Sequence, residues 1–332
     1  MLIALTGAVV IVLTVTDLML TTLSVASPRG FVSARLADRL WRGILRVDPP
    51  ARVLRLLGVT IVSGIVAAWV LLQWTGWALV FIGAGDAVVS SQGGGPVGSG
   101  ERVYFAGYLV STMGNGDYTT LGTGWQIASV LASFTGLLTA TLAITFLVPV
   151  ASGVVQRRQV ATQIASLGGT PQTILARSWN GTDFSALGQH LSNLYSDLHL
   201  LTQRHLAYPV LHYFHSDERY TAVAPMLAVL DDTLLLLQHG APDPGIDTLT
   251  LTATRDAVAE LLDLLEGVVI VPTAEPPPAP ELRWLERLGA ATVDRETFCE
   301  VLAREERHRR LLNGFVHSDG WEWTDVHHAP DK

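Results

Sequence analysis

Residues 111 to 118 read STMGNGDY and lie between two long apolar segments. An apolar segment, a short amphipathic stretch, this strand with two glycines and a second apolar segment follow one another along the chain. The pattern Thr-x-Gly-x-Gly-Asp occurs by chance when it stands alone, so its position carries the information. Gly114 and Gly116 are two residues apart, and glycine adopts positive φ at little cost. The order of segments predicts a loop between two membrane spans, with a backbone that alternates in conformation.

The segment STMGNGDYTTLG resembles the selectivity filter of the potassium-channel superfamily, whose usual core is Thr-Val-Gly-Tyr-Gly-Asp. This resemblance covers about residues 53 to 150. It implies an all-α membrane protein, a tetrameric pore-loop cation channel of the prokaryotic two-transmembrane type, here with an extra N-terminal span and a helical cytoplasmic domain. In such a filter, backbone carbonyls replace the hydration shell of the ion. The ion-binding residues that the resemblance implies are Thr112, Met113, Gly114, Asn115 and Gly116, with Asp117 at the pore mouth.

The sequence departs from the usual filter at Asn115, where the family has tyrosine, and at Met113, where it has valine. In the family the tyrosine ring packs behind the filter and holds its diameter. We therefore expect potassium or other monovalent cations to permeate, with a weaker preference for potassium. Asp117 either adds to a ring of carboxylates that concentrates cations or braces the filter against the pore helix. The alternative function is a non-conducting membrane receptor or scaffold with a degenerate pore fold.

The composition fits a chain that lies partly in a membrane. Of the 332 residues 49% are hydrophobic and 16% are charged, too apolar for an ordinary soluble protein and too polar for spans throughout. The net charge of −8 argues against a partner of nucleic acid. Cys299 is the only cysteine, which excludes an intrachain disulfide. No nucleophile–base pattern and no cofactor motif is recognised, so we expect neither an enzyme nor a cofactor.

Three segments are long enough to span a bilayer, from Leu2 to about Leu23, from Val53 to about Phe81 and from Trp125 to Val150. Arginines cluster between the first two segments and after the third, and the positive-inside rule places both clusters in the cytoplasm. We therefore expect a multi-pass protein of a prokaryotic plasma membrane, with the N-terminus outside and the C-terminal region inside. A signal peptide cleaved after Ser24-Val25-Ala26 is the competing interpretation of the first segment.

The predicted organisation has four parts: an N-terminal transmembrane helix at 1–25, a basic amphipathic cytoplasmic connector at 28–52 that contacts membrane lipids, a pore domain at 53–150 and a helical cytoplasmic domain at 154–332. The pore domain would comprise an outer helix, an exposed turret at 90–100, a pore helix at 101–112, the filter and an inner helix that Pro149 ends. Gly136 in the inner helix is either a gating hinge or a site of close packing. One pore loop per chain implies a homotetramer.

Asp17 lies within the first span, where a charge is costly. Two placements are open. Asp17 either pairs with an arginine of the connector or faces the second span.

The cytoplasmic region shows helical patterns at 154–167, 171–178, 183–206, 208–214, 217–239, 246–268, 281–289 and 294–312. Pro272 to Pro280 predicts a stiff linker, and the tail after Asn313 a loosely ordered end. His205, His212 and His215 are the one chemical cluster. They would bind a transition metal, sense pH, or serve as ordinary structural histidines. No motif identifies the ligand of this domain.

Overall fold

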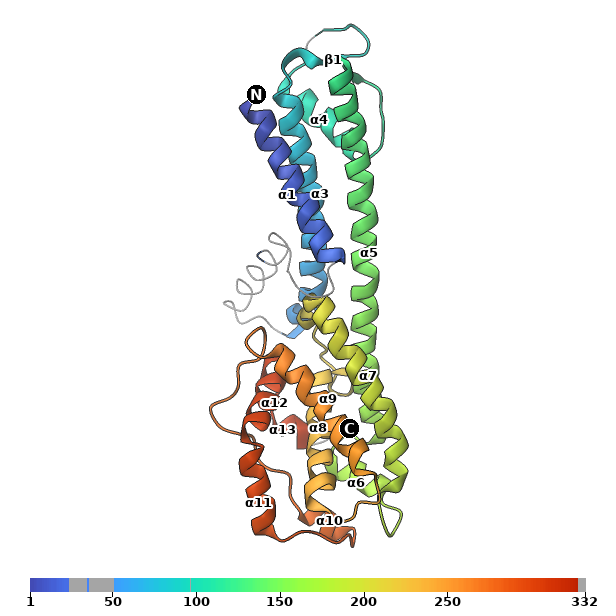
Figure 1. Ribbon diagram of the computed structural model, residues 1–332, viewed down its shortest axis with the longest axis vertical. Coiled ribbons are helices and arrows are strands. Elements are labelled where there is room, and N and C mark those ends of the chain that lie inside the picture. Colours follow the sequence, from blue (N-terminus) through green and yellow to red (C-terminus); the bar gives the residue numbers. More distant parts are fainter. Residues whose placement is uncertain (24–34, 36–50, 96, 328–332) are drawn as a thin grey trace. The chain divides into compact units, whose positions relative to one another are not determined.

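The computed structural model describes residues 1–23, 35, 51–95 and 97–327, and in this part of the chain the protein is mostly helical (Figure 1). The chain divides into two compact units. The first unit ends at Ala151, and the second runs from Ser152 and includes the start of the second span up to Gly58. Most of the predicted connector, and the cleavage-like sequence at 24–26, lie outside the described residues.

Three helices are long and apolar enough to cross a membrane. They are α1 (Leu2–Leu23), α3 (Ala51–Ile82, apolar from Leu56) and α5 (Thr123–Leu167). Large apolar side chains such as Leu5, Val59 and Phe134 are exposed on all three, as expected of a surface that faces lipid. The three spans predicted from the sequence are thus present as helices, and the protein has the build of a membrane protein.

Helices α1 and α3 pack antiparallel through glycines (Figure 1). A Cβ atom built on Gly7 would lie 2.5 Å from the carbonyl oxygen of Gly76, and one built on Gly83 would lie 2.6 Å from the backbone nitrogen of Ala4. Small residues allow this close approach, which drives helix association in membranes where the hydrophobic effect does not. The extra N-terminal helix is therefore fitted to the second span along most of its length.

The loop between the second and third spans contains the helix α4 (Ser99–Val110), close to the predicted pore helix at 101–112. Glu101 caps this helix, since its carboxylate accepts a hydrogen bond of 2.6 Å from the backbone N–H of Gly98. A pair of short strands, which the sequence did not predict, adjoins the start of the predicted turret. After the short helix η1 (Gly85–Ala87), β1 (Val88–Ser90) pairs antiparallel with β2 (Tyr118–Thr120), with Val88 opposite Thr120.

The expectation that Pro149 ends the inner helix is wrong, because α5 continues through it and is 45 residues long in all. Proline removes one backbone hydrogen bond and crowds the carbonyl of residue i−4, here Thr145. The flanking Phe146 and Val150 are both buried. Tertiary packing on either side of the proline therefore keeps the helix continuous.

The second unit is a bundle around α8 (Val223–Leu235), all thirteen residues of which are buried. Helices α6 (Pro171–Ser178), α9 (Thr248–Leu265), α12 (Glu306–Ser318) and α13 (Thr324–His327) pack against it, and α7 (Gly188–Ala207) packs on α9 (Figure 1). The remaining elements are η2 (Ser185–Leu187), η3 (Pro209–Tyr213), η4 (Arg219–Thr221), η5 (Leu236–Gly240), α10 (Arg283–Arg287) and α11 (Arg295–Arg304).

Two expectations about the end of the chain are wrong. The predicted helix at 294–312 is two helices, α11 and α12, which meet at Glu305. The tail after Asn313 is not loosely ordered as far as the structure describes it, because Val326 is buried and Arg219 donates to its carbonyl oxygen at 3.2 Å. The proline-rich stretch is also held, since the N–H of Thr273 donates to the carbonyl of Arg310 at 3.2 Å.

The packing of α1 on α3 leads to a prediction. Gly7→Val should lower the free energy of unfolding of the solubilised protein by about 1–3 kcal/mol, the usual cost of overpacking. Ala8→Val adds the same side chain at the next, exposed position and is the matched control. Thermal unfolding in detergent, followed by circular dichroism, measures both. Equal stability of the two variants would contradict the glycine-mediated contact.

Candidate functional site

The seven residues that follow α4 form an irregular strand, Ser111 to Asp117, and all seven are exposed. Positive φ angles occur at every second residue: 57° at Thr112, 60° at Gly114 and 82° at Gly116. Threonine rarely adopts positive φ, and such a conformation costs about 1–3 kcal/mol unless the surroundings impose it. The strand therefore has the alternating backbone that the glycine spacing predicted.

The beginning of the strand is attached to the end of α4. The carbonyl oxygen of Tyr108 accepts hydrogen bonds from the N–H of Met113 at 2.9 Å and of Gly114 at 3.4 Å. The N–H of Thr112 donates to the carbonyl of Leu109 at 3.0 Å. The last carbonyls of the helix, which have no partner within it, thus fix the start of the strand.

Asn115 is held from two sides. Its amide nitrogen donates to the hydroxyl oxygen of Tyr104 at 2.6 Å and to Oδ2 of Asp117 at 2.5 Å. The Tyr104 hydroxyl in turn donates to the same Asp117 oxygen at 3.4 Å. Asp117 therefore braces the strand against α4, one of the two roles expected of it. We call Tyr104, Asn115 and Asp117 the clamp.

The far end of the strand is fixed by the paired strands β1 and β2, which we call the β-ribbon, and by the side chain of Tyr108. The N–H of Ser91 donates to the carbonyl of Asp117 at 2.9 Å, next to the paired strands. Tyr108, which is buried, donates its hydroxyl proton to the carbonyl of Tyr118 at 2.7 Å. Its ring meets that of Tyr104 edge to face with centroids 5.4 Å apart. Both ends of the strand are thus attached to the same short helix.

Gly136 of α5 lies directly behind the end of α4. A Cβ atom built on Gly136 would lie 1.9 Å from the carbonyl oxygen of Val110. No other residue type fits at that distance without a shift of the backbone. Of the two roles expected for Gly136, the contact supplies a direct reason for close packing. The hinge remains a prediction.

Asp17 faces the second span, as one of the two expectations had it. The side chain is fully buried, and Oδ2 accepts a hydrogen bond of 2.8 Å from the indole nitrogen of Trp69. The Trp69 ring meets Phe146 of α5 edge to face at 5.5 Å. Asp17 thereby links α1 to the other two spans, and a buried polar group with a partner is what a membrane interior requires.

The predicted metal site at His205, His212 and His215 is not supported. Among the described residues, no group of three or more His, Cys, Asp or Glu side chains could hold a metal ion. Nδ1 of His205 lies 3.0 Å from the carbonyl of Leu201 in its own helix, and Nδ1 of His215 lies 2.9 Å from Oδ1 of Asp319. These two ring nitrogens thus engage separate partners.

The same surroundings make two of these histidines poor pH sensors. Burial, and after it the charge of Arg157, lowers the pKa of His205 to about 3. Burial likewise lowers the pKa of His212 well below its usual value. Both imidazoles are therefore neutral at physiological pH.

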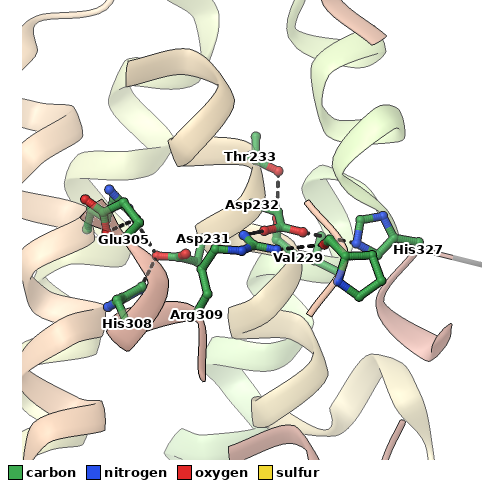
Figure 2. A network of polar contacts seen from close by, with 10 residues as sticks. Val229, Asp231, Asp232, Thr233, Glu305, His308, Arg309 and His327 are labelled. Atoms are coloured by element: carbon green, nitrogen blue, oxygen red, sulfur yellow. Dashed lines mark hydrogen bonds and ion pairs between the residues drawn. The ribbon is translucent and has the colours of Figure 1, made fainter. Parts of the chain in front are cut away.

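A second polar cluster went unnoticed in the sequence. Asp231 and Asp232 lie side by side on α8, and both are fully buried. Figure 2 shows that the two side chains point in different directions, toward different partners. Oδ1 of Asp231 lies 2.9 Å from Nε2 of His308, and Arg309 donates to Oδ1 of Asp232 at 2.5 Å. The signal was present in LAVLDDTLLLL, where two adjacent acids interrupt a long apolar run.

Further side chains complete this acid-pair network. Arg255 donates to Asp231 at 3.4 Å and to Glu305 at 2.8 Å. His327 Nε2 lies 3.1 Å from Oδ2 of Asp232. Burial alone would raise the pKa of Asp231, but the positive charges of His308 and Arg255 outweigh it and hold the pKa well below its usual range. The network joins α8, α9, α12 and α13, and loss of one partner of a buried pair costs about 3–5 kcal/mol.

The network predicts a pH dependence of stability. Burial lowers the pKa of His308, but the adjacent Asp231 carboxylate more than offsets this, so the net shift is upward. A raised pKa means that this stabilisation is complete below about pH 6.5, the ordinary value, and is lost as pH rises through the folded-state value. Histidines with lowered pKa values, such as His205 and His212, contribute a stability that is instead lost as pH falls below about 6.5.

His308→Gln should therefore flatten the fall in stability above about pH 6.5, relative to the natural chain. His190→Gln, at an exposed position of α7, is the control and should leave the slope unchanged. The measurement is the unfolding temperature of the full chain from pH 6 to pH 9. A slope that His308→Gln does not alter would contradict the ionised His308–Asp231 pair.

Comparison with known proteins gives one informative match. The chain is 30% identical over 309 residues to the uncharacterized membrane protein YdjJ of Bacillus subtilis (strain 168), and the match covers 92% of this chain and 91% of that protein. No protein-family model matches the chain, and no solved structure matches it. A similarity of this level over most of both chains shows the family, so the chain belongs to the same family of membrane proteins as YdjJ.

Proposed function

We propose that this protein is the subunit of a homotetrameric pore-loop cation channel in a prokaryotic plasma membrane, with residues 112 to 116 as its ion-binding filter. The observation that carries the proposal is the alternation of positive φ at Thr112, Gly114 and Gly116. An alternating backbone lets successive carbonyls point to one side, where they can replace the water around a cation. The strand follows a short helix between two spans, which is the order that a pore loop needs.

The exposure of the strand supports an assembly of several chains. Irregular backbone within a membrane is tolerated only where it is buried in protein or lines water. In one chain all of residues 111 to 117 are exposed, so the strand needs either neighbouring copies or a water-filled axis beside it. A four-fold arrangement around that axis supplies both. In it, four Asp117 carboxylates would surround the mouth of the pore.

We propose potassium as the favoured ion, with a preference that depends on the clamp. The usual filter is held open by a packed tyrosine ring, which Asn115 lacks. Its hydrogen bond to Tyr104 is a substitute brace from the same chain. The hydrogen bonds of Asn115 yield more easily than a packed ring, so discrimination against sodium should be weaker than in the usual filter. Other monovalent cations would also permeate.

The proposed orientation has the N-terminus outside and the helical second unit in the cytoplasm, from the positions of the arginines. We assign the gating of the channel to this unit. The observation that supports this assignment is that α5 runs without a break from Thr123, beside the pore loop, to Leu167 of the second unit. In this proposal, a change in the second unit is transmitted to the pore along α5.

Conduction can be tested with a matched pair of glycine variants. Gly114 (φ 60°) and Gly94 (φ 63°) have the same backbone conformation, and a Cβ on either meets no atom within 4 Å. Gly114→Ala and Gly94→Ala therefore impose similar local strain, of about 1 kcal/mol or more. Purified protein in potassium-loaded liposomes should conduct. Gly114→Ala should reduce the flux at least tenfold, while Gly94→Ala should leave it within twofold.

The mass of both variants in detergent should correspond to four chains, which shows that assembly is intact. A protein that carries no cation flux at any pH, voltage or calcium level would contradict the channel and favour the non-conducting receptor. Equal loss of flux in both variants would contradict the placement of the filter.

Selectivity can be tested at the clamp. Tyr104→Phe removes the hydroxyl that accepts from Asn115, and should shift the reversal potential under a potassium/sodium gradient toward zero. Tyr118→Phe is the control. It also removes a tyrosine hydroxyl near the strand, but that hydroxyl contacts Glu101 at 3.4 Å and not Asn115. The expected order of potassium preference is natural chain, Tyr118→Phe, then Tyr104→Phe well below both. An unchanged reversal potential in Tyr104→Phe would show that the clamp does not set the width of the filter.

A further inference from the structure

The second unit contains a cavity of about 700 Å³ that none of the roles above uses. Its walls come from the start of α3, from α5 just beyond Ala151, from residues 214–223 and from the end of α12. This volume lies within the range of about 300–1,000 Å³ that is typical of small-molecule sites. The cavity therefore has room for a ligand of drug-like size, and two of its walls belong to helices that continue from the spans.

Most of the lining is apolar. Leu56, Val155 and Phe214 contribute to it, with Val223 on the side of α8. Apolar walls favour a ligand with an apolar body, because burial of apolar surface gains about 25 cal/mol per Å². Val155 is 67% exposed, so this wall is open and not part of the packed core.

The polar feature that points to a ligand is Asp319, which lines the same cavity and whose side chain is only 1% exposed. Its Oδ1 atom lies 2.9 Å from Nδ1 of His215 and accepts a hydrogen bond of 3.3 Å from Arg157. Within the part of the chain that the structure describes, no hydrogen-bond donor reaches Oδ2. A buried acceptor without a donor costs about 1–3 kcal/mol, so a ligand that supplies one recovers that free energy.

The charges at the cavity determine the head group. Arg157 already pairs with Asp319, and Arg158 is 67% exposed and lies 4.0 Å from Glu218. A second carboxylate, that of Asp217, also lines the cavity. An anionic head would meet Asp319 and Asp217, whereas a hydroxyl, an amide or an ammonium group would offer a proton to Oδ2.

We propose that this cavity is a binding site for a small amphipathic ligand, whose hydrogen-bond-donating head reaches Asp319 and whose apolar body lies against Val155 and Phe214. Binding here does not depend on whether the protein conducts ions. A ligand in this place would contact α5 and the start of α3 together.

The test uses three probes with one body and three heads: benzyl alcohol, benzylamine and benzoate. Each is added at millimolar concentration to the full chain in detergent, and binding is read by saturation-transfer NMR of the probe. Val155→Trp fills the cavity. Val148→Trp is the matched control, because it adds the same ring two turns earlier on α5 at a residue that is 60% exposed and does not line the cavity.

The alcohol and the amine should give signals that fall at least threefold in Val155→Trp and persist in Val148→Trp, and benzoate should bind at least threefold more weakly than either. If benzoate binds as well as the other two, the head group does not need to donate a hydrogen bond. That result would overturn the proposal and indicate a site in which the arginines bind an anion. Signals that Val155→Trp leaves unchanged would show partition into detergent, and no site. Since no ion flux is measured, failure of the channel proposal would leave this result intact.

Discussion

Hydrocarbon offers no hydrogen bonds to a polypeptide backbone, and this constraint governs the first unit. Helices α1, α3 and α5 satisfy it within themselves, but the strand from Ser111 to Asp117 is not helical. Its partners come from the end of α4, through the carbonyl of Tyr108, and from the β-ribbon, through the N–H of Ser91. The exposed remainder needs water or further chains. Such a strand can stay open to water outside the bilayer, whereas within the hydrocarbon it would need further chains or a water-filled path beside it.

The second unit meets a related constraint differently. Two carboxylates on adjacent residues of a buried helix cannot both face one partner, so Asp231 and Asp232 require partners on opposite sides. Arg255 and His308 serve the first, and Arg309 with His327 serves the second (Figure 2). Buried ion pairs are weak sources of net stability, but a packing that separates the partners leaves an uncompensated charge in the interior and is strongly disfavoured. The acid-pair network thus explains why α13, only four residues long, holds a fixed place.

Much of the architecture was predictable from the sequence, and the misses have physical causes. The spans follow from apolar length, and α6 begins at Pro171 as predicted because Thr170 caps it. The prediction from Pro149 was wrong, because the tendency of proline to end a helix is overridden where the residues on both sides of it are packed. The β-ribbon at Val88 was hidden beside a glycine- and serine-rich stretch. The alternating strand was predicted from the spacing of its glycines, but its clamp was not. Tyr104 and Asn115 are eleven residues apart and meet only in three dimensions.

The contact between Gly136 and Val110 has a mechanical consequence. Backbone here rests on backbone, with no side chain between to deform, so α5 cannot slide past the end of α4 without displacing the base of the strand. Pro149 of the same helix lacks the N–H that would continue the ladder of hydrogen bonds, so α5 bends most easily near that turn. A load that displaces α5 at the end of the first unit would therefore be divided between flexure at Pro149 and strain on the strand, and the stiffness of that one turn sets the ratio.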